Sequence, residues 1–176
     1  MHISKLKKYY FINEFNFSKL IKLDRDISLI WRSKHTEKDK ISIIQAAKFC
    51  KKYKRKFFIS NDFKLAVKLN INGVYISAYN KNLRHNNYKF KSNFKIIGSA
   101  HNYCEIVIKK MQNVEEIFMS PIFKYKSRSA LGLYKTKIIF DLFRGQKIAL
   151  GGINKNNLRL LYLNKYSGFA GIDYFS

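Results

Sequence analysis

The chain has 176 residues, 47% of them hydrophobic, which is enough for one domain with a substantial core and too few for two ordinary domains. Its 35 Lys and Arg residues against 11 Asp and Glu residues give a formal charge of +24. The aromatic content of 16% excludes a disordered chain, and two cysteines are too few for a disulfide-stapled module. We therefore expect a single domain over residues 1–176.

The first residues and the hydrophobic runs indicate where the protein works. No apolar run approaches the roughly 20 residues that cross a bilayer. Charged residues such as Lys5, Lys8 and Glu14 occur early, and no apolar segment follows them as it would in a signal peptide. These features predict a cytoplasmic protein with no membrane partner.

The positive charge consists of 28 Lys and 7 Arg residues spread along the chain. Proteins that bind nucleic acids favour Arg for bidentate contacts, so this balance is a weak sign of such a partner. The accompanying excess of Asn, Ile, Tyr and Phe matches drift toward AT-rich codons. We expect no nucleic-acid partner, whereas a basic field would also attract small phosphate substrates.

Short apolar, β-branched or aromatic runs recur along the chain, each followed by a polar turn. The predicted strands are Lys8–Ile12, Ser28–Trp31, Lys56–Ile59, Gly73–Ile76, Lys95–Ile97, Glu116–Met119, Lys147–Leu150 and Phe169–Tyr174. Several are apolar almost throughout, which is typical of strands covered on both faces in a parallel sheet.

Amphipathic segments alternate with these strands. The predicted helices are Ile41–Tyr53, Asp62–Leu69, Tyr103–Lys110 and Asn154–Leu163, with Asn61, Asn102 and Asn154 at the expected N-cap positions. Eight βα units predict an α/β fold, a compact (β/α)8 TIM barrel. Spreading 176 residues over eight units leaves about 22 for each, with no room for the final helix. A doubly wound open sheet is the alternative.

Four further residues have predicted environments. Cys50 and Cys104 lie on apolar helix faces and are predicted to be buried. Glu115 and Glu116 stand at the start of the sixth strand and are interpreted as solvated loop residues.

In a TIM barrel the functional site lies at the carboxyl ends of the strands. The residues that follow the predicted strands are Arg32 and Lys34, Asn61 and Asp62, Asn80, Ser99 and His101, Pro121 through Arg128, Gly151 and Gly152, and Ser176. Polar and cationic groups therefore gather at one rim of the predicted barrel.

Two loops of this rim carry specific chemistry. Gly151 and Gly152 connect a strand to a predicted helix start, where bare backbone N–H groups can bind phosphate; a simple tight turn is the alternative. Asp62 at a strand end can ligate Mg²⁺ while Asn61 binds an oxyanion; a helix cap is the alternative.

Cations at the rim form a third feature. Arg32 and Lys34, with Arg128 across the rim, can clamp a diphosphate. Lysines at a spacing of two are frequent by chance on this chain, so the pair alone is weak support.

Taken in order, several segments resemble the thiamine-phosphate synthase family, which includes related thiazole tautomerases. They are Phe58–Asp62, Leu65–Ala66, Asn72–Ile76, Ile96–His101, Ser120–Phe123, Leu131–Leu133, Ala149–Ile153 and Gly168–Ile172. The resemblance covers most of the chain and implies a TIM barrel. It also implies an enzyme that joins a hydroxymethylpyrimidine diphosphate to a thiazole phosphate and releases pyrophosphate, with Mg²⁺ as cofactor.

The resemblance assigns roles by position. Arg32, Lys34, Asn61 and Ser99 would bind the pyrimidine diphosphate, with Arg128 in place of a diphosphate-binding Lys. Asp62 would be a Mg²⁺ ligand, and the second magnesium carboxylate of the family falls at Asn80. Tyr125, Ser127, Gly152, Phe175 and Ser176 would hold the thiazole phosphate.

Three activities remain open at this point. The synthase reaction is favoured by the presence of Arg32, Lys34, Asn61 and Asp62. The loss of a carboxylate at Asn80 favours a thiazole tautomerase, which needs no Mg²⁺, or a weakened homologue that binds phosphate ligands. A nucleic-acid binder would require a basic stripe away from the rim. The sequence does not indicate the oligomeric state.

Overall fold

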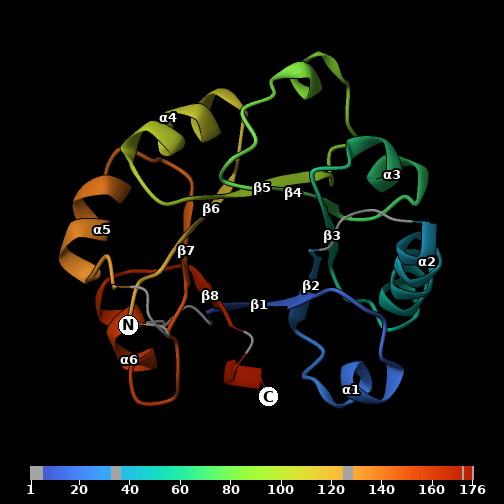
Figure 1. Cartoon of the computed structure of the whole chain (residues 1–176), viewed down its shortest axis with the longest axis horizontal. Coiled ribbons are helices and arrows are strands. Elements are labelled where there is room, and N and C mark those ends of the chain that lie inside the picture. Colours follow the sequence, from blue (N-terminus) through green and yellow to red (C-terminus); the bar gives the residue numbers. More distant parts are fainter. Residues whose placement is uncertain (1–5, 33–36, 125–128, 172, 176) are drawn as a thin grey trace.

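The eight strands close into a parallel barrel in chain order (Figure 1). The computed structural model describes residues 6–32, 37–124, 129–171 and 173–175. The strands are β1 (Lys7–Ile12), β2 (Ile27–Trp31), β3 (Phe57–Ser60), β4 (Gly73–Ile76), β5 (Lys95–Ala100), β6 (Glu116–Met119), β7 (Gln146–Leu150) and β8 (Gly168–Ala170). Pairing of β1 with β8 completes the barrel. The predicted (β/α)8 fold is confirmed, and the open sheet is excluded.

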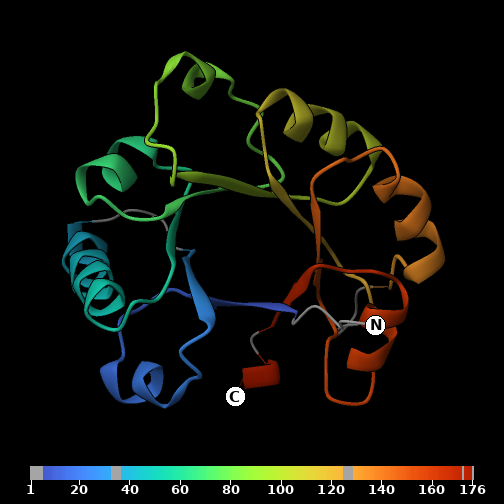
Figure 2. The ribbon, with the colours of Figure 1, turned by 180° about the vertical axis from the view of Figure 1, so that it is seen from behind.

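Helices surround the barrel when it is seen from either end (Figures 1 and 2). They are α1 (Phe17–Lys22), α2 (Glu37–Lys52), α3 (Phe63–Lys68), α4 (Tyr103–Met111), α5 (Leu133–Phe140) and α6 (Leu158–Leu163). A single 3-10 turn, η1 (Arg84–Asn87), lies between β4 and β5, and a second, η2 (Asp173–Phe175), follows β8. Among the described residues, no helix is long and apolar enough to cross a membrane.

Several predicted boundaries are wrong. The eighth strand ends at Ala170 rather than at Tyr174, because the chain turns into η2. The sixth helix begins at Leu158, since the Asn154 side chain accepts from the backbone N–H groups of the next turn instead of capping a helix. The predicted cap at Asn61 is also wrong, because the neighbouring Asp62 caps α3.

The predicted cap at Asn102 is confirmed, whereas the predicted burial of the two cysteines is correct for Cys50 and wrong for Cys104. Asn102 is the N-cap of α4, as predicted, and accepts from the Glu105 N–H at 3.0 Å. Cys50 is buried, but Cys104 is exposed, because it lies on the outer face of α4. The apolar residues beside Cys104 in the sequence therefore did not indicate which face of the helix meets the barrel.

Aromatic side chains fill the middle of the barrel. Tyr9, Phe11, Phe58, Tyr75 and Phe118 are each no more than 6% exposed. Their rings meet mostly edge to face, with centroids 5.0 Å apart for Tyr9 and Phe118 and 5.5 Å apart for Tyr75 and Phe118. Because the interior is packed with side chains, the middle of the barrel offers no room for a ligand.

The turn after β8 packs against the outer wall of the barrel. Phe175 of η2 stacks on Phe169 of β8 at 5.8 Å and meets Tyr10 of β1 edge-on at 5.9 Å. Tyr174 also meets Phe169, at 4.8 Å. Three-residue η2 thus shields the outward side chains at the seam between β8 and β1, near the C-terminal end seen in Figure 1.

Glu116 is buried in the barrel, so its interpretation as a solvated loop residue is wrong. Its side chain is 2% exposed and lies 2.5 Å from the Lys7 ammonium and 3.6 Å from that of Lys95. The Tyr9 hydroxyl also donates to it, and burial together with the adjacent carboxylate raises the pKa of Tyr9. A buried carboxylate is tolerated only when it is paired, and these three partners supply that pairing.

We predict that Glu116→Gln lowers the free energy of unfolding by about 2 kcal/mol, because Lys7 loses its charged partner inside the barrel. Glu115→Gln is the matched control, since the neighbouring Glu115 side chain is 49% exposed and its ion pair with Lys95 is long, at 3.6 Å. Urea denaturation measures both changes. Equal losses in the two variants would contradict a structural role for the Glu116 cluster.

Candidate functional site

Asn61 connects the end of β3 to the loop after β4. Its backbone adopts the left-handed conformation, with φ of 58°, which Asn tolerates better than most residues. Its amide donates to the Ser77 hydroxyl at 2.6 Å and the Tyr79 hydroxyl at 3.2 Å. Its carbonyl oxygen accepts from the Ser77 N–H and the Asn80 amide, both at 3.0 Å. Asn61 therefore fixes the loop that carries Asn80.

Asp62 and Asn80, the two predicted metal ligands, line the same hollow. It has a volume of about 230 Å³ and is also lined by Asn61, Asn82 and Arg84, among others. One oxygen of Asp62 accepts from the Leu65 N–H at 2.9 Å and caps α3. The other makes no hydrogen bond to a described residue. The structure thus shows the helix cap that the sequence left as an alternative, while one carboxylate oxygen stays available.

The side-chain oxygens in this hollow are too few to bind Mg²⁺ alone, so a bound substrate or water would have to supply further oxygen ligands. The Asn80 side-chain oxygen accepts from the Asn82 N–H at 2.9 Å and retains a second lone pair. Among the described residues, no group of three or more His, Cys, Asp and Glu side chains is placed to hold a metal. Mg²⁺ is commonly bound by one or two carboxylates plus substrate phosphates and water. Asp62 and Asn80 fit that shared arrangement and do not form a complete cage.

Lys109 and Gln112 of the α4 region support the Asn80 loop from below. Lys109 is fully buried and donates to the Asn80 backbone carbonyl and to the Gln112 side-chain oxygen, both at 2.8 Å. The Gln112 amide donates to the carbonyls of Asn80 and Asn82 at 2.9 Å. Burial lowers the pKa of Lys109 to about 8, and the nearby Glu105 opposes this shift.

Arg32 and Ser99 approach Tyr75 at the mouth of the barrel. Arg32 directly follows β2, and its guanidinium lies 5.5 Å from the ring centroid of Phe11. Ser99 on β5 is 5% exposed and hydrogen-bonds to the Tyr75 hydroxyl. Burial raises the pKa of Tyr75, which the Ser99 hydrogen bond and the Arg32 charge oppose. The phenol of Tyr75 is therefore a neutral polar group held by Ser99 near Arg32.

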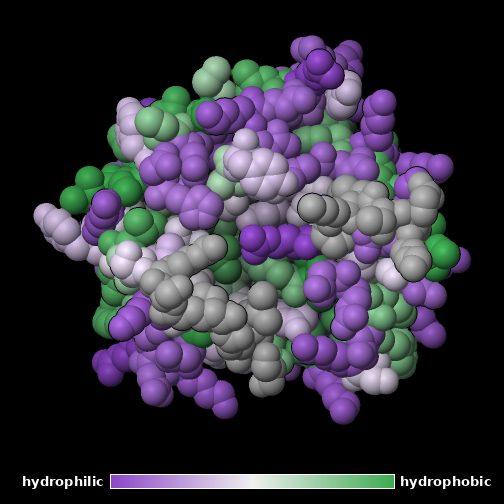
Figure 3. Space-filling view, in the orientation of Figure 1, coloured by the Kyte–Doolittle hydropathy of each residue, from purple (hydrophilic) through white to green (hydrophobic). Residues whose placement is uncertain are grey.

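Hydrophilic side chains predominate on the barrel end that faces the viewer in Figure 3, and hydrophobic ones show mostly toward its edge. Polar side chains thus lie at the end of a barrel whose interior is filled by buried hydrophobic side chains.

The two glycines after β7 form a turn against the loop after β6. Gly151 and Gly152 have φ values of 88° and 68°, in the region that favours glycine. A Cβ on Gly152 would lie 2.7 Å from the Lys124 carbonyl oxygen, so only glycine allows this approach. Because α6 starts at Leu158, the glycine N–H groups belong to a turn, not to the predicted helix start.

The remaining predicted residues divide into two sets. The Phe175 side chain packs outward on Tyr10 and Phe169, so a ligand contact from this residue would come from its backbone. Lys34, Tyr125, Ser127, Arg128 and Ser176 lie outside the described residues.

Sequence reasoning missed the groups that position the site. Tyr75, Ser77, Tyr79, Lys109 and Gln112 contact predicted site residues but were not singled out. Ser77 and Tyr79 lie within three residues of Asn80, so a search of the whole loop would have found them. Lys109 and Gln112 gave no signal, because lysine on a helix is usually solvated.

The fold and the rim define a parallel α/β barrel whose polar groups meet at the ends of β2 to β5, where the functional site of such barrels lies. The chain belongs to the thiamine monophosphate synthase family, whose model matches residues 26–175.

Solved structures agree on the fold. The thiamine phosphate pyrophosphorylase from Pyrococcus furiosus matches with a TM-score of 0.70 and 18% identity, covering 97% of this chain and 87% of that one. Citrate synthase SbnG has a TM-score of 0.71 at 7% identity, covering 96% of this chain and 86% of that one. A structure described as native KDPGal has a TM-score of 0.68 at 12% identity, covering 96% and 84%. A comparison with curated proteins gave no match.

Lys109 predicts a specific pH dependence of stability. In the unfolded chain it keeps its proton up to its ordinary pKa of 10.5, whereas in the folded protein it loses it near pH 8. Between these values the unfolded state binds more protons, so stability rises with pH. We expect the free energy of unfolding of wild type, relative to Lys109→Met, to rise between about pH 8 and 10.5 and to stay level at lower pH.

Urea denaturation across this pH series measures the effect. The exposed neighbour gives the control, because Lys110→Met removes a solvated ammonium and should follow wild type at every pH. Parallel profiles for wild type and Lys109→Met would show that the Lys109 proton is not linked to folding.

Proposed function

We propose that this protein is a Mg²⁺-dependent transferase that joins hydroxymethylpyrimidine diphosphate to a thiazole phosphate, forming thiamine phosphate and pyrophosphate. The observation that carries the proposal is that Asp62 and Asn80 line one hollow, held together by Asn61, in a member of the thiamine monophosphate synthase family. Arg32 and Ser99 lie at the mouth of the same barrel.

The proposed reaction takes place between the two substrates, and the protein forms no covalent bond to either of them. The bond between the pyrimidine methylene carbon and the diphosphate oxygen breaks, and its electron pair leaves with pyrophosphate. The thiazole nitrogen lone pair then forms the new bond to that carbon and leaves a thiazolium. The protein has to stabilise the departing negative charge and align the two substrates.

Arg32, Asp62 and Asn80 serve the departing diphosphate in this proposal. Mg²⁺, when bound with the substrate, would neutralise charge on the diphosphate. Asp62 would hold the ion through its uncapped oxygen and Asn80 through its amide oxygen. The Arg32 guanidinium, always protonated, would donate to diphosphate oxygens in a bidentate manner. Lys34 and Arg128 would add positive charge.

The second substrate would sit across the rim. The backbone of Gly152, which passes close to the Lys124 carbonyl, would bind the thiazole phosphate. Tyr125, Ser127, Phe175 and Ser176 would complete the pocket for the thiazole phosphate. Ser99 and Asn61 would position the pyrimidine; Asn61 would do so while retaining the loop contacts that it already makes.

A thiazole tautomerase is a second candidate, and one observation favours it. Asn80 supplies no charge where the synthase reaction benefits from a second carboxylate, and one carboxylate lines the hollow. A tautomerase moves a proton on a thiazole carboxylate phosphate and needs a phosphate site but no diphosphate clamp. Turnover of such a thiazole without Mg²⁺ and without the pyrimidine substrate would identify this activity.

We predict that purified protein with Mg²⁺ and both substrates forms thiamine phosphate, and that Asp62→Asn lowers kcat by about 100-fold or more. Asn is as good an N-cap as Asp, so this variant keeps α3 capped while removing the charge. Product is quantified by chromatography. No product from folded wild type at high Mg²⁺, with the thiazole phosphate still bound, would refute the synthase proposal.

We further predict that Asn80→Asp lowers the Mg²⁺ concentration needed for half-maximal activity by about tenfold, because a second charge enters the shared hollow. Asn82→Asp provides the control on the same loop. It lines the hollow, but its side chain accepts from the Arg84 N–H at 2.8 Å, which keeps it turned into the loop. An unchanged Mg²⁺ dependence in Asn80→Asp would remove Asn80 from the metal site.

A further inference from the structure

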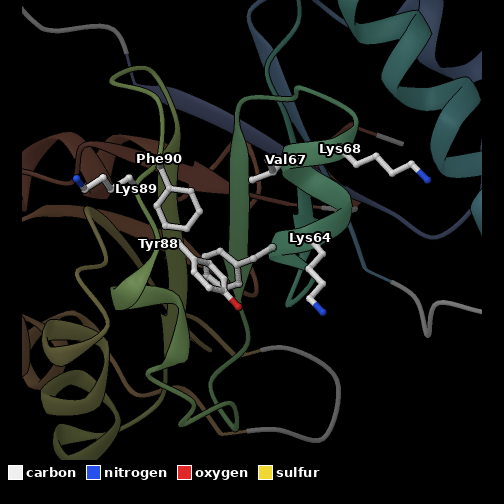
Figure 4. Close-up of a pocket in the computed structure, with 7 residues that line it drawn as sticks. Lys64, Val67, Lys68, Tyr88, Lys89 and Phe90 are labelled. Carbon is white, nitrogen blue, oxygen red and sulfur yellow. The ribbon is translucent and has the colours of Figure 1, made fainter.

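A groove runs along the outer wall of the barrel between α3 and the segment that follows η1 (Figure 4). We call it the outer groove. It has a volume of about 380 Å³ and is lined by Phe63, Lys64, Val67, Lys68, Tyr88, Lys89 and Phe90. Phe63, Lys64 and Tyr88 also line the adjoining hollow of Asp62 and Asn80, whereas the other four residues do not.

The outer groove exists because the connection from β4 to β5 contains a 3-10 turn where the other connections between consecutive strands contain a helix. Side chains of this connection cover the barrel wall in its place. Phe63 stacks on the buried His85 at 4.4 Å, and Phe90 stacks on Phe94 at 4.6 Å. Phe63 and Phe90 also meet, at 5.7 Å, so the groove has a continuous aromatic floor held by its neighbours.

The rim of the groove is positively charged. Lys64, Lys68 and Lys89 are exposed, and none of the three makes an ion pair or hydrogen bond with a described residue. In Figure 4 the three side chains extend away from the rings in different directions, with Lys89 on one side and Lys64 and Lys68 on the other. No acidic residue lines this groove, so its charge favours an anion.

Aromatic surface in the groove is accessible from solvent. Tyr88 is 47% exposed, and Val67 opposite it on α3 is 55% exposed. Two smaller hollows continue the groove at either end. One is the hollow of Asp62 and Asn80, which shares Phe63 and Tyr88 with it, and the other shares Val67 and Phe90.

We propose that the outer groove binds a small aromatic phosphate, a planar ring joined to a phosphate group. Its volume falls in the range of small-ligand pockets. Rings line the floor, and offset or edge contacts with another ring stabilise binding beyond area burial alone. The three lysines place ammonium donors around those rings, where they pair with a phosphate. A second copy of this chain is a poor occupant, since each carries +24.

Adenosine monophosphate is a suitable probe, because it combines a planar ring with one phosphate. Binding is measured by calorimetry on the full chain. We expect Val67→Glu to weaken binding by about tenfold or more, since it places a carboxylate in the groove beside Lys64 and Lys68. Val107→Glu on α4 is the matched control, because it is also exposed and should leave binding unchanged.

The same titration on Arg32→Ala separates the groove from the rim site, because Arg32 lies at the mouth of the barrel. Binding that Arg32→Ala removes, or that Val67→Glu leaves intact, would place the ligand at the rim and overturn the proposal. Absence of saturation up to about 10 mM would also overturn it, since a 1 mM site would then be almost full.

Two further ligands test the chemistry. Adenosine should bind at least about tenfold more weakly than its monophosphate, because the lysines then have no anion to pair with; equal affinities would refute the phosphate contact. A single-stranded oligonucleotide that binds more than about tenfold tighter than the monophosphate, and loses that affinity in Val67→Glu, would replace the small ligand by nucleic acid.

Discussion

Closure of β1 on β8 is the constraint on which the rest of this barrel depends. A parallel barrel has no free edge only if its last strand pairs with its first, and here β8 has three residues for that purpose. Gly168 makes the pairing close, since a Cβ there would lie 2.5 Å from the Lys7 carbonyl oxygen. Phe175 then covers the seam from outside. A close glycine contact and aromatic packing thus secure the seam between the last strand and the first.

Burial of the strands on both faces explains which parts of the fold could be predicted from the sequence. Seven strands were predicted to within a few residues, because strands buried on both faces are apolar runs that need no periodicity. The eighth was extended to Tyr174, an aromatic residue of the kind common in strands, but the strand ends at Ala170 and Tyr174 packs back on Phe169. The helices α1 and α5 were missed. α5 buries Thr136 while it exposes Tyr134 and Ile138, so its apolar pattern does not mark its inner face.

The site shows a similar division. Residues that follow strands were predicted from position alone, and the structure brings Asn61, Asp62 and Asn80 together as parallel strands require. What position cannot give is the state of each side chain. Asn61 is engaged on both its donors and its acceptor, and half of the Asp62 carboxylate caps a helix. The role of buried Lys109 could not be predicted from the sequence, because it depends on a tertiary contact between α4 and the backbone carbonyl of Asn80.

The cations of this basic chain fall into two groups, those with structural contacts and those exposed to solvent. Many of the lysines are exposed on the helices, whereas Lys7, Lys109 and Arg55 have structural contacts. Arg55 is 5% exposed and donates to carbonyls at the end of α1. Taking a cation out of water costs free energy, so each of these cations depends on its carboxylate or carbonyl partners. Lys109 and Arg55 donate to backbone carbonyls, and Lys7 pairs with buried Glu116, so the stability of the barrel depends on part of its positive charge.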